Sequence, residues 1–222
     1  MTLRLMTSLK KRWRILRDPE IRRFRALIRQ FKREQGRGTP VQFDNVDASS
    51  IVFDLGGFEG EWTRDMRRIY DCSVHVFEPH PLFSSSLAAQ FRNDDKVICH
   101  DFALGDKDGE LMLSDDADAS SALGGEGKHI AGRIRSVQAV MDELHLTEIA
   151  VAKINIEGGE YDILPALIAL GLIARFGSLA VQFHNYGPGD AQRREAIRTS
   201  LEATHNCVWN YDFVWEKWDR KT

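Results

Sequence analysis

The chain has 222 residues, of which 43% are hydrophobic and 28% are charged, an ordinary composition for one globular domain with an appendage. It contains no run of about 18 apolar residues, which argues against a membrane-spanning helix. The three cysteines are widely spaced and form no CxxC pair, so neither a zinc knuckle nor a disulfide framework is indicated.

The net charge of −3 conceals a strong asymmetry: residues 1–38 carry 13 Lys/Arg and 3 Asp/Glu, and the remainder carries 17 and 30. Apolar residues recur at helical spacing up to Phe31, and Pro19 divides the helix, with Asp18 capping its second piece. We expect a basic amphipathic arm over residues 1–38 and one main domain over residues 39–222. The arm either packs its apolar stripe on protein, the alternative we favour, or lies on an anionic membrane or a nucleic acid.

Strands and helices alternate from residue 50 onward, and this alternation predicts a doubly wound α/β fold with a mostly parallel sheet. The expected strands are 51–55, 73–77, 97–101, 150–156 and 178–183. The expected helices are 61–70, 81–91, 137–144, 161–170 and 190–203. A turn-rich insertion with a short strand at 110–113 and a long loop at 114–127 follows the third strand; the loop is either a lid or a surface excursion. The aromatic tail after residue 207 predicts antiparallel edge strands.

The segment 51–63 (IVFDLGGFEGEWT) places an acid, Asp54, at a strand end before a glycine-rich turn, and the next strand ends in Glu78. This order is typical of nucleoside-cofactor sites in α/β proteins. The turn is not the GxGxxG of nicotinamide enzymes, and its acids would repel a pyrophosphate. S-adenosylmethionine has no phosphate and carries a cationic sulfonium and an ammonium group, which acids stabilise.

We therefore predict an S-adenosylmethionine site, with Glu78 accepting hydrogen bonds from the ribose hydroxyls and Asp101 to Ala103 covering the adenine. Gly56 and Gly60 would let the backbone approach the ligand without a Cβ. The predicted cofactor-binding residues are Asp54, Gly56, Gly57, Phe58, Gly60, Glu78, Pro79, Asp101, Phe102, Ala103 and Asn155.

Four blocks of the chain resemble the FkbM-type class of S-adenosylmethionine-dependent methyltransferases. They are residues 51–63, 76–81 (VFEPHP), 101–109 (DFALGDKDG) and 151–164 (VAKINIEGGEYDIL). The resemblance spans roughly residues 50–185 and implies a Rossmann-like class I methyltransferase fold of about seven strands. It also implies an enzyme that transfers a methyl group to a hydroxyl of a sugar, a glycan precursor or a secondary metabolite.

The sequence departs from the family at Asn155, where an aspartate is usual. An amide keeps the hydrogen-bonding shape but cannot act as a base or as an anionic metal ligand. A catalytically weakened binding or scaffold protein is therefore an alternative. A nicotinamide oxidoreductase is a third hypothesis, and the missing GxGxxG argues against it.

The predicted catalytic residues are Asn155, Glu157 and His184. They lie at the carboxyl ends of the strands expected at 150–156 and 178–183. A hydroxyl is a poor nucleophile while protonated, and His184 is the natural general base at neutral pH, with Glu157 as the other candidate. We predict no dedicated metal site, although these side chains with Glu160 offer a set for Mg²⁺. Lys153, within an apolar strand, needs a partner, for which Glu157 or Glu78 is a candidate.

The expected partners are a small-molecule or glycan acceptor, a second copy of the chain in a homodimer, and a membrane surface contacted by residues 1–38. No nucleic acid is expected. We expect the protein to be cytoplasmic, beside the inner face of the membrane.

Overall fold

The computed structural model describes residues 18–36, 38–114 and 129–222, which divide between two compact units, Met1–Pro40 and Val41–Thr222. The first piece of the predicted arm and nearly all of the loop predicted at 114–127 lie outside the described residues. No helix in the described ranges combines the length and the apolar content needed to cross a membrane.

The first unit contains one described helix, α2 (Pro19–Glu34). Asp18 caps it as predicted: one carboxylate oxygen accepts hydrogen bonds from the backbone N–H groups of Glu20 and Ile21, at 2.9 and 3.3 Å. Pro19 occupies the first turn, where its missing N–H costs nothing. Cap and proline together explain why the helix begins here.

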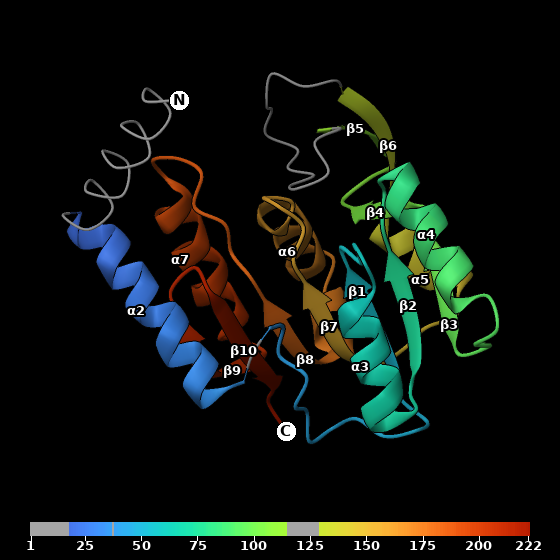
Figure 1. Ribbon diagram of the computed structural model, residues 1–222, viewed down its shortest axis with the longest axis horizontal. Coiled ribbons are helices and arrows are strands. Elements are labelled where there is room, and N and C mark those ends of the chain that lie inside the picture. Colours follow the sequence, from blue (N-terminus) through green and yellow to red (C-terminus); the bar gives the residue numbers. More distant parts are fainter. Residues whose placement is uncertain (1–17, 37, 115–128) are drawn as a thin grey trace, which may run out of the picture. The chain divides into compact units, whose positions relative to one another are not determined.

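The second unit is built on a seven-stranded sheet in the order β3-β2-β1-β7-β8-β10-β9 (Figure 1). The strands from β3 to β8 are parallel, and β10 is antiparallel to both neighbours. The prediction of a mostly parallel sheet is thus confirmed, as is that of antiparallel strands in the aromatic tail. The bounds are β1 (Ile51–Leu55), β2 (Ser73–Phe77), β3 (Val97–His100), β7 (Ile149–Ile154), β8 (Phe176–Val181), β9 (His205–Tyr211) and β10 (Trp215–Arg220).

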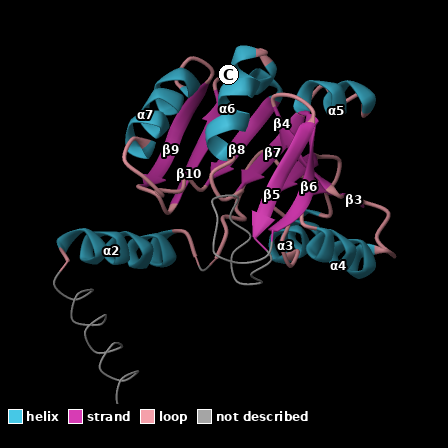
Figure 2. Cartoon of the chain, turned by 90° about the horizontal axis from the view of Figure 1, so that it is seen from above, coloured by secondary structure: helices cyan, strands magenta, loops and turns pink. Residues whose placement is uncertain are grey.

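Helices cover both faces of this sheet, α3 and α4 on one side and α5, α6 and α7 on the other (Figure 2). The central strands are buried almost throughout, which explains why they read as apolar runs rather than alternating patterns. The bounds are α3 (Glu61–Tyr70), α4 (Pro81–Phe91), α5 (Val137–Glu143), α6 (Glu160–Ala169) and α7 (Asp190–Leu201), with a short 3₁₀ helix at Leu172–Arg175.

The insertion forms a second sheet that the sequence analysis reduced to one short strand. It has the order β4-β6-β5, with β4 (Phe102–Gly105) parallel and β5 (Gly109–Ser114) antiparallel to β6 (His129–Ser136). The strand β6 was missed because Arg133 and Arg135 make its sequence polar. Its alternation of Ile130, Gly132 and Ile134 with polar or small residues was the available signal.

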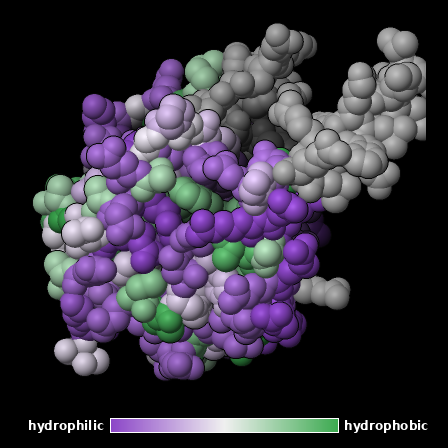
Figure 3. Space-filling view, turned by 90° about the vertical axis from the view of Figure 1, so that its left-hand side faces the viewer, coloured by the Kyte–Doolittle hydropathy of each residue, from purple (hydrophilic) through white to green (hydrophobic). Residues whose placement is uncertain are grey.

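On the face shown in Figure 3, hydrophobic residues form small separate groups among hydrophilic ones. The exposed large hydrophobic side chains of the main unit include Phe58, Leu82 and Met112. Single exposed apolar residues are normal on a protein surface. The described residues on this face therefore form no broad apolar patch.

Candidate active site

A pocket of about 1040 Å³ opens at the carboxyl ends of β1, β2 and β7. Its wall includes Gly56, Glu78, Ala103, Asn155 and Glu157. Ligand sites of α/β sheets lie at this edge, and a volume of this size is at the upper end for small-molecule sites. The pocket can hold a nucleoside cofactor and the reacting part of an acceptor.

The glycine turn after β1 is shaped by close backbone packing. Gly56 has φ +82°, and a Cβ there would lie 2.1 Å from the carbonyl oxygen of Asn155. Gly60 has φ +75°, and its Cβ would press on Gln90 and Leu87 of α4. Gly56 lines the pocket, whereas Gly57 and Gly60 do not. The turn therefore needs glycine for strand and helix packing, rather than for approach to a ligand as we predicted for Gly60.

Glu78 lies at the end of β2, where it was predicted, and is 5% exposed in the pocket wall. One carboxylate oxygen accepts from the N–H of Phe58 at 2.9 Å and the other from the N–H of His80 at 3.0 Å. Burial raises the pKa of Glu78, and these two hydrogen bonds act against that shift. Each oxygen keeps a further lone pair for a ligand.

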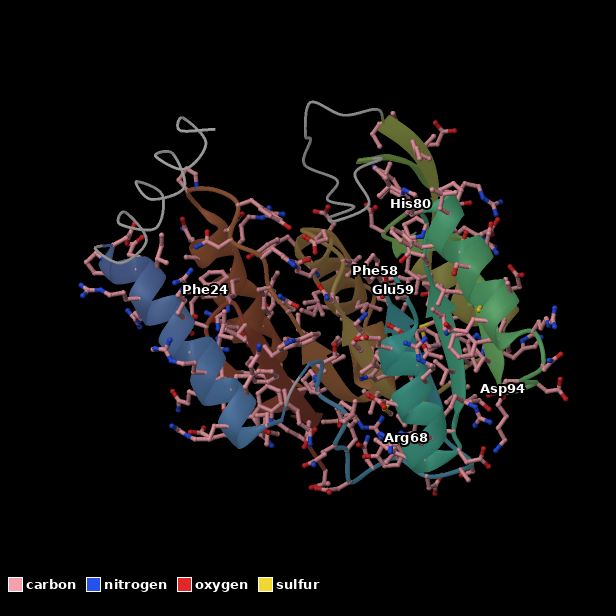
Figure 4. The ribbon with its side chains drawn as sticks, in the orientation of Figure 1. Phe24, Phe58, Glu59, Arg68, His80 and Asp94 are labelled. Atoms are coloured by element: carbon pink, nitrogen blue, oxygen red, sulfur yellow. The ribbon has the colours of Figure 1, made fainter. Side chains whose placement is uncertain are left out.

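Two other predicted residues lie beside Glu78. Phe58, in the turn after β1, lies at the pocket and is 42% exposed; its ring packs edge-on against that of Phe83, with centroids 4.7 Å apart. Pro79 also lines the pocket. Figure 4 labels Phe58 and Glu59 in this turn and His80 at the start of α4. The two backbone N–H groups that hold Glu78 thus come from the turn after β1 and from the residue before α4.

Asp54 is fully buried and does not line the pocket. Its carboxylate accepts from Thr63 Oγ1 at 2.7 Å and from Lys153 Nζ at 2.8 Å. Lys153 also donates to the carbonyl oxygens of Leu55 and Gly56, at 3.3 and 2.5 Å. The partner of Lys153 is therefore Asp54, not Glu157 or Glu78, and the pair braces the backbone of the glycine turn.

The three residues predicted to cover an adenine separate in the structure. Ala103 lines the pocket. Phe102 is buried in the hydrophobic core, and Asp101 is exposed in an ion pair with Arg133 at 2.5 Å. The geometry thus favours Ala103 alone among the three.

Asn155 follows β7 and lines the pocket. Its Oδ1 atom is the one buried side-chain nitrogen or oxygen in the described part of the chain that has no hydrogen-bond partner. An unpaired buried polar atom costs free energy comparable to a lost hydrogen bond. A ligand donor in the pocket would satisfy it, which agrees with the prediction of a ligand contact at Asn155.

Glu157, His184 and Glu160 form a cluster behind and in the pocket wall. His184 Nδ1 lies 3.0 Å from Glu160 Oε1, and His184 Nε2 lies 3.5 Å from Glu157 Oε1. Glu160 is fully buried and also accepts from the N–H groups of Gly158 and His184, at 2.8 and 2.7 Å. Glu157 reaches the pocket, and the hydroxyl of Tyr186 donates to it.

The charge state of His184 differs from the one that the general-base hypothesis needs. Burial alone would lower its pKa, but the carboxylates of Glu157 and Glu160 raise the pKa to about 9. The hydrogen bond from His184 lowers the pKa of Glu157. At neutral pH the imidazole therefore carries two protons and the carboxylate none. Of the two candidates for a base, the geometry favours Glu157, because His184 neither lines the pocket nor has a free lone pair.

The same contacts bear on the Mg²⁺ hypothesis. Within residues 18–36, 38–114 and 129–222, no group of three or more His, Cys, Asp or Glu side chains has the geometry to hold a metal ion. Both ring nitrogens of His184 face carboxylates. The residues present do not fit the metal site considered from the sequence.

The sequence analysis missed the pocket wall contributed by the start of α7 and the loop before it, which includes Tyr186, Asp190 and Arg193. The guanidinium of Arg193 lies over the ring of Tyr161, 4.5 Å from its centroid. The available signal was the aromatic residue two positions after His184 in a loop that follows a buried strand.

No family model matches the chain, and no curated protein matches it. Among solved structures, the fibrillarin/Nop5p complex matches with a TM-score of 0.51 and 11% identity, over 79% of this chain and 75% of that one. The Methanococcus jannaschii fibrillarin, a pre-rRNA processing protein, matches with a TM-score of 0.47 and 12% identity, over 82% of this chain and 70% of that one. Aeropyrum pernix fibrillarin with natively bound S-adenosyl-L-methionine matches with a TM-score of 0.45 and 9% identity, over 90% of this chain and 76% of that one.

The fibrillarin/Nop5p complex contradicts the partner expectation made from the sequence. That expectation was a small-molecule or glycan acceptor, a homodimer or membrane contact, and no nucleic acid. The matching structure is instead a complex of fibrillarin with the protein Nop5p.

At this level of identity the likeness concerns the fold. The sheet of seven strands with one antiparallel member, the helices on both faces and the match to the fibrillarin complex agree with the fold class expected from the sequence. The main unit has the Rossmann-like fold of class I methyltransferases.

Proposed function

We propose that the protein is an S-adenosylmethionine-dependent methyltransferase of the FkbM type that acts on an oxygen of a macromolecular acceptor. The observation that supports S-adenosylmethionine as the methyl donor is the charge of the pocket wall. Its described lining contains five acids, Glu78, Asp106, Glu157, Asp162 and Asp190, and one base, Arg193. An acidic wall opposes a pyrophosphate and favours a cationic cofactor.

The chain's residues fit this cofactor at two points. Glu78 offers spare carboxylate lone pairs at the end of the second strand, where ribose hydroxyls bind in open α/β sheets. Asn155 offers a buried oxygen without a partner. When bound, S-adenosylmethionine supplies a methyl group on a positively charged sulfur.

The chain's own part in the reaction is to hold and deprotonate the acceptor. Glu157 carries an ionised carboxylate at the pocket wall, oriented by His184 and Tyr186. When an acceptor hydroxyl takes the methyl group, Glu157 would accept the hydroxyl proton, and the electron pair of the broken carbon–sulfur bond would leave with the sulfur. Positioning of the oxygen supplies much of the acceleration of such a displacement.

The test is calorimetry with S-adenosylmethionine, S-adenosylhomocysteine and NAD on the full chain. We expect the first two to bind and NAD not to bind. Binding of NAD alone would overturn the proposal. The acceptor arm uses S-adenosylmethionine labelled in the methyl group, with total RNA in one reaction and total protein in another. Label in alkali-resistant dinucleotides of the hydrolysed RNA, or on a hydroxyl side chain identified in the digested protein, supports an oxygen acceptor on a macromolecule.

Asn155 motivates the alternative of a binding or scaffold protein that keeps the pocket. The variant Asn155→Asp discriminates the two. Methyl transfer by the protein as it stands supports the enzyme, whereas transfer that appears only in the variant supports the scaffold.

A further inference from the structure

The cluster of Glu157, His184 and Glu160 does not cancel its own charge. Two carboxylates face one imidazolium, so the three side chains carry a net charge of −1 at neutral pH. Glu160 is fully buried, and the side chains of His184 and Glu157 are 12% and 33% exposed, so water screens this charge less than it screens a charge at the surface. The buried pair of Asp54 and Lys153, by contrast, is neutral as a unit.

The order of the strands places this charge along a bound cofactor. Glu78 ends β2, and Ala103, on the β3 side of it, lines the same pocket. On the opposite side of Glu78 come β1 and then β7, and the turns after them touch, since a Cβ on Gly56 would meet Asn155. A cofactor with its ribose at Glu78 and its base at Ala103 extends its sulfur toward β1 and β7, where Glu157 lies.

Resting on the proposed function, we propose that Glu157 is a specificity-determining residue that selects the sulfonium form of the cofactor over its demethylated product. His184 and Glu160 are positioning residues that act through it. They hold the Glu157 carboxylate in place and leave one negative charge to face the sulfur.

The physical basis is that the donor and its product differ at one site. S-adenosylmethionine carries a positive sulfur, and S-adenosylhomocysteine carries a neutral one; their ribose, adenine, carboxylate and amine are the same. A fixed, poorly screened negative charge therefore acts on the ratio of the two affinities and leaves shared contacts unchanged. The cluster would favour entry of the donor and departure of the product.

The experiment is the ratio of the two dissociation constants, measured by calorimetry on the full chain. In Glu157→Gln we expect the preference for S-adenosylmethionine over S-adenosylhomocysteine to fall between about three- and thirtyfold, because one charge is removed while the shape is kept. Glu160 lies outside the pocket wall. Glu160→Gln should nevertheless lower the same ratio, because the remaining pair of Glu157 and His184 has no net charge.

Two variants serve as controls. Asp162→Asn makes the same charge change on the same pocket wall, but the Asp162 side chain is 77% exposed and screened, so the ratio should stay within about twofold. Tyr186→Phe removes the hydroxyl contact to Glu157 without changing charge, and should lower the ratio less than Glu157→Gln does. Thermal melts establish that each variant is folded.

The outcomes separate this inference from the proposed function. If both ligands bind the unaltered protein and their ratio is the same in Glu157→Gln, the inference is wrong and the cofactor assignment stands. If neither ligand binds the unaltered protein, the proposed function itself fails.

Discussion

Two groups of ionic side chains lie beside the same pocket, and they differ in net charge although their residue types are similar. Asp54 and Lys153 neutralise each other at 2.8 Å, outside the pocket lining. Glu157, His184 and Glu160 keep one uncompensated charge, and Glu157 reaches the pocket. An acid at a strand end is thus structural when a buried cation neutralises it, and available to a ligand when its partners leave a net charge.

The largest effect should come from breaking the neutral pair. Lys153→Met leaves the carboxylate of Asp54 buried without its cation, and we expect the free energy of unfolding to fall by about 3–5 kcal/mol. Urea unfolding measures it. The double variant Lys153→Met/Asp54→Asn should recover part of the loss. A loss below about 1 kcal/mol in the single variant would contradict a structural role for the pair.

The second prediction concerns Glu78, which we propose binds the part that S-adenosylmethionine and S-adenosylhomocysteine share rather than the sulfur. Glu78→Ala should weaken S-adenosylmethionine and S-adenosylhomocysteine alike, by roughly ten- to a hundredfold, because hydrogen bonds to a charged acceptor are lost. Calorimetry measures both affinities, and Glu78→Gln, which keeps one oxygen, should lose less. Unchanged affinities would remove Glu78 from the site, and a change confined to one ligand would undo the contrast with Glu157.

The third prediction uses pH to test the charged cluster. The pKa of His184 is raised from 6.5 to about 9 in the folded state, so its contribution to stability is fully present below about pH 6.5 and is lost as pH rises through 9. We expect a loss of about 2 kcal/mol over this range, measured by urea unfolding at each pH. The groups around it are Glu157, Glu160, Tyr186 and the hydroxyl of Tyr161.

His184→Gln is the matched control and should flatten that slope. The buried pair His75 and His100, whose ring nitrogens lie 3.0 Å apart, cannot produce it. Burial lowers the pKa of each to about 4, so both are neutral above pH 6.5 in the folded and the unfolded state. Their titration therefore changes the free energy of unfolding only below that pH. If stability falls with pH in His184→Gln as it does in the unaltered protein, another group causes the pH dependence.

The smallest effect should come from Asp101, which was expected at the adenine. Its ion pair with Arg133 is exposed on both sides, at 67% and 62% of the side-chain areas. Asp101→Asn should therefore cost less than about 1 kcal/mol and leave the affinity for S-adenosylhomocysteine unchanged. A large drop in that affinity would restore Asp101 to the cofactor site.

Part of the pocket wall could be predicted from the sequence. Glu78, Pro79 and Phe58 line the pocket as expected, because each lies within a few residues of a strand end that the apolar runs already marked. The helices at 61–70 and 81–91 have the expected bounds. The polar strand β6 was missed, since its pairing with β4 and β5 rather than its own composition makes it a strand.

The sequence by itself determined the α/β alternation, the place of the pocket and the acidic character of its rim, because these follow from short-range patterns. Only the tertiary structure decided which acids are free to act. Asp54 is neutralised by a lysine 99 residues away, and His184 is held protonated by acids 24 and 27 residues before it. Such pairings depend on which strands become neighbours, and burial then fixes their charge states.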